Sequence, residues 1–343
     1  MKKYCNTLYV TTQDTYLARE GECVVVLKDK EVRLRLPVHT LQGIVCFGQV
    51  GASPALMAHC AEHSVAVSFL TENGRFLARV QGGVSGNVLL RRQQYRWADD
   101  EEMSVRFVRW LLLCKIANSR TVLQRHLRDH ADAPGKDAVE YAVRRLDRLT
   151  GQVEADNTLE ALRSTEGEAA RVYFQVFDSL ILVQKEDFFF HARSRRPPLD
   201  NVNALLSFLY VLLYHDARAA LEGIGLDPAV GFLHRDRPGR YGLALDLMEE
   251  FRSVLADRLV LSLINRQQVD GKGFRRTESG GVEMNEATRK EVIVGWQKRK
   301  QEEIRHPFLD ETMAVGLLLH VQAMLLARYI RGDLDAYPPY FWK

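Results

Sequence analysis

The sequence predicts an α+β protein, with a small N-terminal β-rich domain followed by a larger all-α domain. Short β-branched or alternating segments fill the first part of the chain, and long apolar or amphipathic segments with helical periodicity fill the rest. The glycine-rich stretch 82–86 separates the two patterns and is expected to be a linker. A length of 343 residues also favours two domains. We therefore divide the chain into domains 1–87 and 88–343.

The composition excludes several classes of protein. Hydrophobic residues make up 46% and charged residues 27%, as in ordinary globular proteins. The five cysteines are scattered and odd in number, which argues against a disulfide framework or a zinc ribbon and favours a reducing compartment. The start of the chain lacks the pattern of a signal peptide, and no segment is apolar enough to predict a membrane span. We expect a cytoplasmic protein with no membrane partner, and a net charge of +3 permits a nucleic-acid partner.

The first domain is predicted to contain strands and one short helix. Expected strands are 8–11, 16–18, 23–27, 32–36, 44–47, 65–70 and 75–80, with a turn at 72–74 between the last two. The helix covers 54–63, with Ser53 at its N-cap and Pro54 in its first turn. His59 and His63 share a face of this helix, but no third ligand is evident, so no metal site is expected there. We interpret the domain as a packing and dimerisation module.

The second domain is predicted to be helical. Expected helices are 103–129, 138–149, 159–182, 204–221, 253–265 and 313–330, with a hairpin at 274–284. The aromatic residues 337, 340 and 342 form an extended end that is expected to dock on this domain or on a partner.

The segment 230–252 carries the first candidate site. An apolar run ends at His234, Pro238 and Gly239 break the backbone, and a helix then begins that carries acidic residues at 246, 249 and 250. Spacings of three and four residues place Asp246 on one helix face with either glutamate. One imidazole with carboxylates is an oxygen-rich set suited to Mg²⁺ or Mn²⁺. The alternative is a solvated acidic helix face beside a core histidine.

Glu166 is the second candidate, in a helical run beside Gly167 and two alanines. Small side chains allow a ligand or another backbone to approach that face closely. Basic residues add candidate DNA contacts. Arg193, Arg195 and Arg196 precede two prolines, and they either grip a nucleic-acid backbone or are solvated loop charges. Interleaved cations and aromatics at 91–97 leave the same two alternatives, nucleic-acid contact or inward packing.

The combination Glu-Gly-x-Ala-Ala-x-x-Tyr-Phe at 166–174, Gly-Phe-Leu-His at 231–234 and Leu-Asp-Leu-Met-Glu-Glu-Phe-Arg at 245–252 is far more specific than any one piece. It closely resembles the adaptation integrase of CRISPR systems, CRISPR-associated endonuclease one. The resemblance extends along almost the whole chain and is greatest to the type I-C form.

The resemblance implies a set of site residues. The family's catalytic metal ligands fall on Glu166, His234 and Glu249, and the divalent ion would be Mg²⁺ or Mn²⁺. The third ligand is Glu where many relatives have Asp, which leaves Glu250 as a rival. The family's pattern adds residues of three further kinds: the supporting residues Asp246 and Tyr214, a Lys-x-x-Asn element at 115–118, and DNA contacts from Arg252, Arg237 and Arg240. The candidates Arg193, Arg195 and Arg196 rest on their loop position, as given above.

The resemblance also implies a metal-dependent DNA endonuclease and integrase. Such an enzyme inserts short foreign DNA into the repeats of the CRISPR array when a 3′-hydroxyl attacks a phosphodiester. The expected partners are double-stranded DNA, a second copy of the chain and a small dimeric protein of the adaptation module. One alternative is a generic structure-selective nuclease acting on branched DNA. The other is a non-catalytic DNA-binding assembly subunit in which Glu166 and His234 form only a buried polar network.

Overall fold

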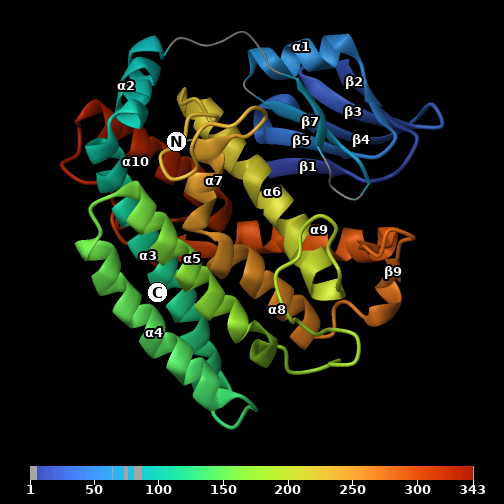
Figure 1. Ribbon diagram of the computed structural model, residues 1–343. Coiled ribbons are helices and arrows are strands. Elements are labelled where there is room, and N and C mark those ends of the chain that lie inside the picture. Colours follow the sequence, from blue (N-terminus) through green and yellow to red (C-terminus); the bar gives the residue numbers. More distant parts are fainter. Residues whose placement is uncertain (1–5, 64, 73–75, 81–86, 343) are drawn as a thin grey trace. The chain divides into compact units, whose positions relative to one another are not determined.

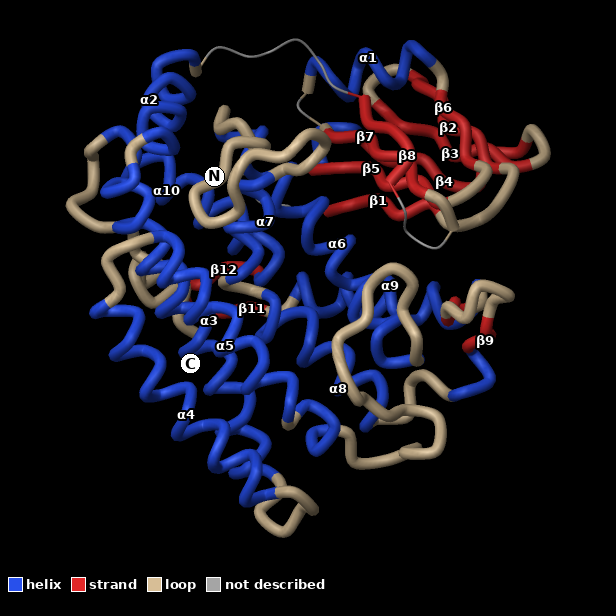
Figure 2. Tube along the Cα trace, viewed as in Figure 1, coloured by secondary structure: helices blue, strands red, loops and turns tan. Residues whose placement is uncertain are grey.

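The computed structural model describes residues 6–63, 65–72, 76–80 and 87–342 (Figure 1). The predicted linker 82–86 and most of the predicted turn 72–74 lie outside these ranges. The chain forms two compact units, one of residues 1–86 with 315–317 and one of residues 87–314 with 318–343. The first unit is rich in strands and the second in helices, which is the predicted fold class (Figure 2).

The first unit contains two four-stranded sheets and one helix. One sheet has the order β1 (Asn6–Val10), β5 (Leu41–Phe47), β7 (Ala66–Leu70), β8 (Phe76–Val80). The other has the order β4 (Glu31–Pro37), β3 (Cys23–Lys28), β2 (Thr15–Glu20), β6 (Val50–Ala52). Strands β1, β5 and β7 are parallel and β2, β3 and β4 are antiparallel. Strand β6 and the 3₁₀ turn η1 (Val38–Thr40) were not predicted, and at three residues each they are too short to show a periodicity.

The core of this unit is formed by alternate residues of both sheets. Leu17, Val24, Ile44 and Cys46 are fully buried in one cluster, and α1 (Pro54–Glu62) adds Leu56 and Cys60 to it. Helix α1 begins as predicted, because Ser53 Oγ accepts a hydrogen bond from the Leu56 amide at 3.2 Å and proline occupies the first turn.

The second unit contains nine of the ten α-helices in the described chain. They are α2 (Val88–Asp99), α3 (Glu101–Asp129), α4 (Lys136–Ala155), α5 (Leu159–Gln175), α6 (Asn201–Ile224), α7 (Gly242–Glu249), α8 (Arg258–Asn265), α9 (Glu286–Gln301) and α10 (Leu318–Arg331). Two 3₁₀ turns, η2 (Phe177–Leu180) and η4 (Gly271–Gly273), and the π-helical turn η3 (Arg252–Asp257) complete the helical segments of this part of the chain, and a further 3₁₀ turn, η5 (Val315–Leu317), belongs to the first unit. Helices α3, α4 and α5 pack against one another side by side (Figure 1). Helix α6 packs against α7, α8, α9 and α10.

Several helix boundaries differ from the prediction, and α4 and α6 each extend beyond the predicted range at both ends. Helix α5 ends at Gln175 instead of 182 because the chain tightens into the 3₁₀ turn η2. The last helix begins at Leu318 instead of 313 because β12 (Thr312–Ala314) pairs with β11 (Glu303–Arg305). The segment 253–265 begins as π-helix and becomes α-helix only at Arg258. The predicted hairpin is present as β9 (Phe274–Arg276) and β10 (Val282–Met284).

Helix α6 is long and apolar enough to cross a membrane by length and composition. However, 67% of its apolar window is buried inside the structure, as in the core helix of a globular unit. Its N-terminus is capped by Asp200, whose side chain accepts a hydrogen bond from the Asn203 amide at 2.7 Å.

The C-terminal segment docks on the helical unit. Asn118 of α3 donates to the carbonyl oxygens of Tyr340 at 2.9 Å and Glu250 at 2.8 Å, and accepts from the Trp342 amide at 2.8 Å. The Trp342 ring lies beneath the guanidinium groups of Arg258 and Arg299. Asn118 therefore fixes the C-terminal segment and the backbone that follows Glu249.

Candidate active site

A buried carboxylate organises the loop that carries His234. Asp246 of α7 is fully buried and accepts hydrogen bonds from the amides of Phe232 (2.7 Å), Leu233 (3.1 Å) and His234 (3.0 Å). Its Oδ1 also lies 2.7 Å from His234 Nδ1. A carboxylate accepts only, so Nδ1 carries the proton, and in the neutral imidazole Nε2 keeps its lone pair. Nε2 lies 3.9 Å from Glu249 Oε1.

Two glycines allow this loop to lie directly on the start of α7. A Cβ on Gly242 would come within 2.3 Å of the His234 carbonyl oxygen, and a Cβ on Gly231 would come within 2.5 Å of the Gly242 carbonyl carbon. Both neighbours are backbone atoms, which cannot move aside as a flexible side chain does. Glycine is therefore required at both positions to bring His234 next to Asp246.

Two further side chains tie the loop to other helices. Arg163 of α5, one turn before Glu166, donates from Nε and Nη2 to the Leu233 carbonyl oxygen, each at 3.0 Å. Gln94 of α2 is buried and donates to the carbonyl oxygens of Asp227 at 2.8 Å and Val230 at 2.9 Å. The loop is thus held between α2, α5 and α7.

The carboxylates of Glu166 and Glu249 meet at one cation, the ammonium of Lys115 in α3. Lys115 Nζ forms a very short hydrogen bond with Glu166 Oε1 and lies 2.8 Å from Glu249 Oε2. The structure therefore brings Glu166, His234 and Glu249 to one place although they come from three different segments. Lys115 belongs to the Lys-x-x-Asn element, whose Asn118 holds the backbone of Glu250, so both ends of the element serve the same site.

Glu249 and Glu250 point to different surroundings. Glu249 Oε2 is buried without a hydrogen bond in good alignment, although Lys115 is close. Glu250 is fully buried elsewhere: it accepts from Gln322 Nε2 at 2.9 Å, from the Tyr340 amide at 2.8 Å and from the Tyr337 hydroxyl. The structure thus places Glu249 in the site and Glu250 in the packing of the C-terminal segment.

The two glutamates also differ in their electrostatics. Burial opposes ionisation of Glu249, but attraction by Arg252, Lys115 and His234 outweighs it and lowers the pKa of Glu249 to about 2. Burial dominates at Glu250, where hydrogen bonds from Tyr337, Tyr340 and Gln322 oppose it only in part, and raises its pKa to about 7. Burial likewise opposes the Lys115 ammonium, but Glu249 and Glu166 outweigh it and raise the Lys115 pKa. Glu249 is therefore the permanently charged member of the pair.

Arg252 lies at the start of the π-helical turn η3. Its Nη2 lies 3.1 Å from Glu249 Oε1, and its guanidinium is 5.3 Å from the ring centre of Tyr210. Arg193 lies 5.3 Å from the same ring and donates to Asn203 Oδ1 at 2.7 Å and Ser207 Oγ at 3.0 Å. The guanidinium of Arg193 is thus used inside the unit. Single π-turns within helices are frequent at functional sites.

Other predicted residues lie in different surroundings. Tyr214 packs against the rings of His215 and Tyr241. Within the described part of the chain, the exposed arginines Arg195, Arg196 and Arg237 and the half-exposed Arg240 form no side-chain ion pairs. In α2, Trp97 packs on Tyr329 and the Tyr95 hydroxyl donates to Asp227 Oδ2 at 2.8 Å, so these aromatics face the protein.

Sequence reasoning missed Arg163, and it named Lys115 only as part of the Lys-x-x-Asn element, without its contacts to the glutamates. Both bond to residues far away in the chain, 51 positions for Lys115 with Glu166 and 70 for Arg163 with Leu233. The spacing of Arg163 and Glu166 by one helical turn was the only available signal.

Comparison with known proteins identifies the family. The model of the family "CRISPR associated protein Cas1" matches residues 8–298. A CRISPR-associated endonuclease Cas1 of Chlorobaculum tepidum is 55% identical over 350 residues that cover 100% of both chains. The chain belongs to the Cas1 family. The predicted function as a DNA endonuclease of CRISPR adaptation is confirmed with the family, and the two alternatives are not favoured.

Solved structures share the Cas1 fold. A casposase bound to an integration product has a TM-score of 0.84 at 20% identity, covering 98% of this chain and 94% of that chain. A Cas6-RT-Cas1–Cas2 complex has a TM-score of 0.83 at 22% identity, covering 99% of this chain and only 36% of that much longer chain. An endonuclease of this family implies a divalent metal. The resemblance to the type I-C form stays a prediction.

The close approach of the two glycines gives a prediction. Gly242→Ala should lower the free energy of unfolding by about 1–3 kcal/mol, because its Cβ overlaps backbone, and it should displace His234 and reduce DNA cleavage. Gly151→Ala in α4 is the matched control: its Cβ meets nothing within 4 Å, so the same change should stabilise by about 0.5–1 kcal/mol. Urea denaturation measures both. Equal effects of the two substitutions would contradict the role of the Gly242 position.

Proposed function

We propose that Glu166, His234 and Glu249 hold the divalent metal ion with which this Cas1-family chain cuts and joins DNA, and that the ion is Mg²⁺ or Mn²⁺. The observation that carries the proposal is the Lys115 ammonium, which both glutamates contact. Two carboxylates share one cation here, and Nε2 of the His234 imidazole lies 3.9 Å from Oε1 of Glu249. This set of groups suits an oxygen-rich metal centre.

The residues fit a metal ion in their chemistry. Glu249 Oε2 is a buried anionic oxygen that a cation already approaches, the Lys115 ammonium at 2.8 Å. Asp246 fixes the tautomer of His234, as carboxylates commonly do for histidines that ligate a metal. The carboxylate oxygens of Glu166 and Glu249 do not converge on a single point, because the Lys115 ammonium lies between them. The Lys115 ammonium therefore stands in for the ion.

The chain's own groups divide the work around the reacting phosphate. When bound, the ion neutralises the extra charge of the phosphorus centre and lowers the pKa of the attacking water or hydroxyl. Arg252, next to Glu249, is placed to contact the scissile phosphate. Gly167, beside Glu166, leaves its helix face open, because a Cβ there would meet nothing within 4 Å.

Adjacent glutamates give the sharpest test of the site. Glu249→Gln should reduce metal-dependent cleavage of DNA at least about 100-fold, because it removes a ligand. Glu250→Gln, the control at the next residue, should keep most activity, because Glu250 contacts the C-terminal segment and its raised pKa shows that the neutral form is tolerated. Plasmid nicking with Mn²⁺ measures both. If Glu250→Gln reduced cleavage more than Glu249→Gln, Glu250 would be the ligand. Full activity of a folded Glu249→Gln variant would show that Glu249 does not bind the metal.

The products distinguish the two enzymatic alternatives. An integrase joins a short duplex with free 3′-hydroxyl ends to a target that contains a CRISPR repeat, whereas a branched-DNA nuclease only cuts it. We propose the joining reaction, as the casposase neighbour bound to an integration product suggests. The covalent product is detected by its increased length on a denaturing gel.

We further propose that exposed arginines grip the DNA backbone. Arg195, Arg196, Arg237 and Arg240 form no ion pairs in the described part of the chain, and a guanidinium pairs well with phosphate oxygens. Arg193 is a weaker member of this group, because its guanidinium already serves Asn203 and Ser207. A net charge of +3 is too small to bind DNA as a bulk property, so affinity has to come from such clusters.

Salt dependence tests this group. Replacing Arg195 and Arg196 with Ala should flatten the slope of log affinity against log salt by about 0.9 for each phosphate group that is no longer neutralised. The control Arg33→Ala with Arg35→Ala removes two arginines of β4 that already pair with Glu31 and Glu20, and should leave the slope unchanged. Fluorescence anisotropy of a labelled duplex gives the slope. If both double variants had the same slope, Arg195 and Arg196 would be solvated loop residues that do not contact DNA.

We also propose a homodimer formed through the first unit, acting in the cytoplasm on foreign DNA and the CRISPR repeat with a small dimeric partner of the adaptation module. The Cas1–Cas2 complex among the structural neighbours suggests Cas2 as that partner. Support for the dimer comes from the sheet that ends in β4. Tyr16, Leu27 and Val32 are direct cross-strand neighbours there, and Tyr16 and Val32 are 45% and 52% exposed. A row of exposed apolar side chains next to an edge strand is a typical association surface.

Light scattering tests the dimer surface. Val32→Asp should convert the dimer to a monomer, because it places a charge in the apolar row. Leu77→Asp in β8 is the control, since Leu77 is equally exposed, at 54%, on the edge strand of the other sheet. A dimer that survives Val32→Asp, or dissociates with Leu77→Asp, would place the interface elsewhere.

A further inference from the structure

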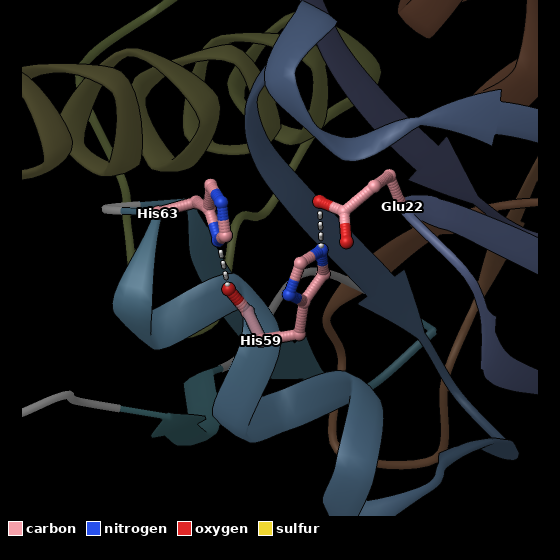
Figure 3. A group of neighbouring side chains, drawn as sticks. All are labelled: Glu22, His59 and His63. Atoms are coloured by element: carbon pink, nitrogen blue, oxygen red, sulfur yellow. Dashed lines mark hydrogen bonds and ion pairs between the residues drawn. The ribbon is translucent and has the colours of Figure 1, made fainter.

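The first unit contains three side chains that face one another and have no part in the catalytic site. Glu22 lies in the turn between β2 and β3, His59 lies on α1, and His63 follows the last turn of α1 (Figure 3). One ligand atom from each lies within 4.8 Å of the others, close enough for the three side chains to hold one metal ion. The sequence suggested the histidine pair but not Glu22, which the fold supplies from a different hairpin.

His59 is buried, with 2% of its surface exposed, and its Nε2 has no hydrogen-bond partner. The nearest polar group is Glu22 Oε2 at 3.4 Å, which lies outside hydrogen-bonding alignment. A buried polar atom without a partner is unfavourable by itself. The nitrogen is aimed at the carboxylate, so an ion between the two would satisfy both (Figure 3).

His63 is already set for coordination. Its Nδ1 lies 2.9 Å from the His59 carbonyl oxygen, and because a carbonyl only accepts, Nδ1 carries the proton and Nε2 keeps the lone pair. A hydrogen bond of this kind commonly fixes the tautomer of histidines that ligate a metal. The i, i+4 spacing places both rings on one helix face with their centres 4.3 Å apart.

We propose that Glu22, His59 and His63 bind one Zn²⁺ ion, with water as the fourth ligand. Two imidazoles and one carboxylate suit zinc, whereas magnesium prefers oxygen alone. Around tetrahedral zinc the ligand atoms are roughly 3.4 Å apart, given bonds of about 2.0–2.1 Å. Closing to that separation requires movement only of the exposed Glu22 and His63 side chains. The competing ion pair of Glu22 with Arg19 Nη2 at 3.3 Å is exposed and weak.

The ion would fasten the β2–β3 turn to α1. Both elements contribute to the same core, Leu17 and Val24 from the strands and Leu56 and Cys60 from the helix. A ligand that binds only the folded state raises stability by mass action, so zinc should stabilise the first unit without taking part in phosphodiester chemistry.

Zinc titration of the full chain tests the site. The background variant His234→Ala removes the imidazole of the catalytic site, and the protein is stripped with a chelator before ZnCl₂ is added in the presence of excess Mg²⁺. We expect one zinc ion per chain by elemental analysis and a higher melting temperature. Glu22→Gln and His63→Ala, both at exposed positions, should each weaken zinc binding at least about 10-fold and abolish the thermal shift.

His39→Ala is the matched control, because His39 is an exposed histidine of the same unit and lies outside the cluster. It should bind zinc as tightly as the background. The proposal is overturned if Glu22→Gln and His63→Ala retain the affinity of the control, or if the background variant retains no zinc after desalting. Neither result depends on nuclease activity, so the outcome is independent of the proposed catalytic site.

Discussion

The hydrogen bonds to Asp246 are the interactions on which the catalytic unit depends. Three consecutive amides and one imidazole share this single buried carboxylate, so the loop from Phe232 to His234 has only one way to lie on α7. The same helix carries Glu249 one turn later. One helix thus supplies a glutamate and, through the carboxylate of Asp246, the orientation of His234. The close approach of Gly231 and Gly242 is what makes this arrangement sterically possible.

Much of the fold follows from local patterns, and the site follows only in part. Strand alternation, the Ser53–Pro54 helix start and the apolar periodicity of α6 are local signals, and the elements they predict are present. The choice between Glu249 and Glu250 was not local. Adjacent helical residues differ by about 100° in direction, and what decides their surroundings is Tyr337, Tyr340 and Gln322, which come from distant segments.

Residues with distant partners were overlooked or misjudged for the same reason. No residue near Lys115 in the sequence indicates that it contacts carboxylates, and no residue near Glu22 indicates that it lies beside histidines. Arg193 was misjudged in the opposite direction. Its position in a loop beside prolines indicates an exposed side chain, but in the structure it contacts Tyr210 and Asn203. Charge in a sequence indicates that a partner is needed, but only the tertiary structure shows whether the partner is another side chain or a ligand.

The position of Lys115 has a consequence for the occupancy of the site. A metal ion that enters between Glu166 and Glu249 competes with an ammonium that belongs to the same chain and cannot diffuse away. Such tethered competition lowers the apparent affinity for every cation by the same factor, so only ions that bind the glutamates strongly occupy the site. The two glutamates therefore share a cationic partner when no metal is bound. Occupancy by a divalent ion then depends on the free concentration of that ion, which has to be high enough to displace Lys115 from the two glutamates.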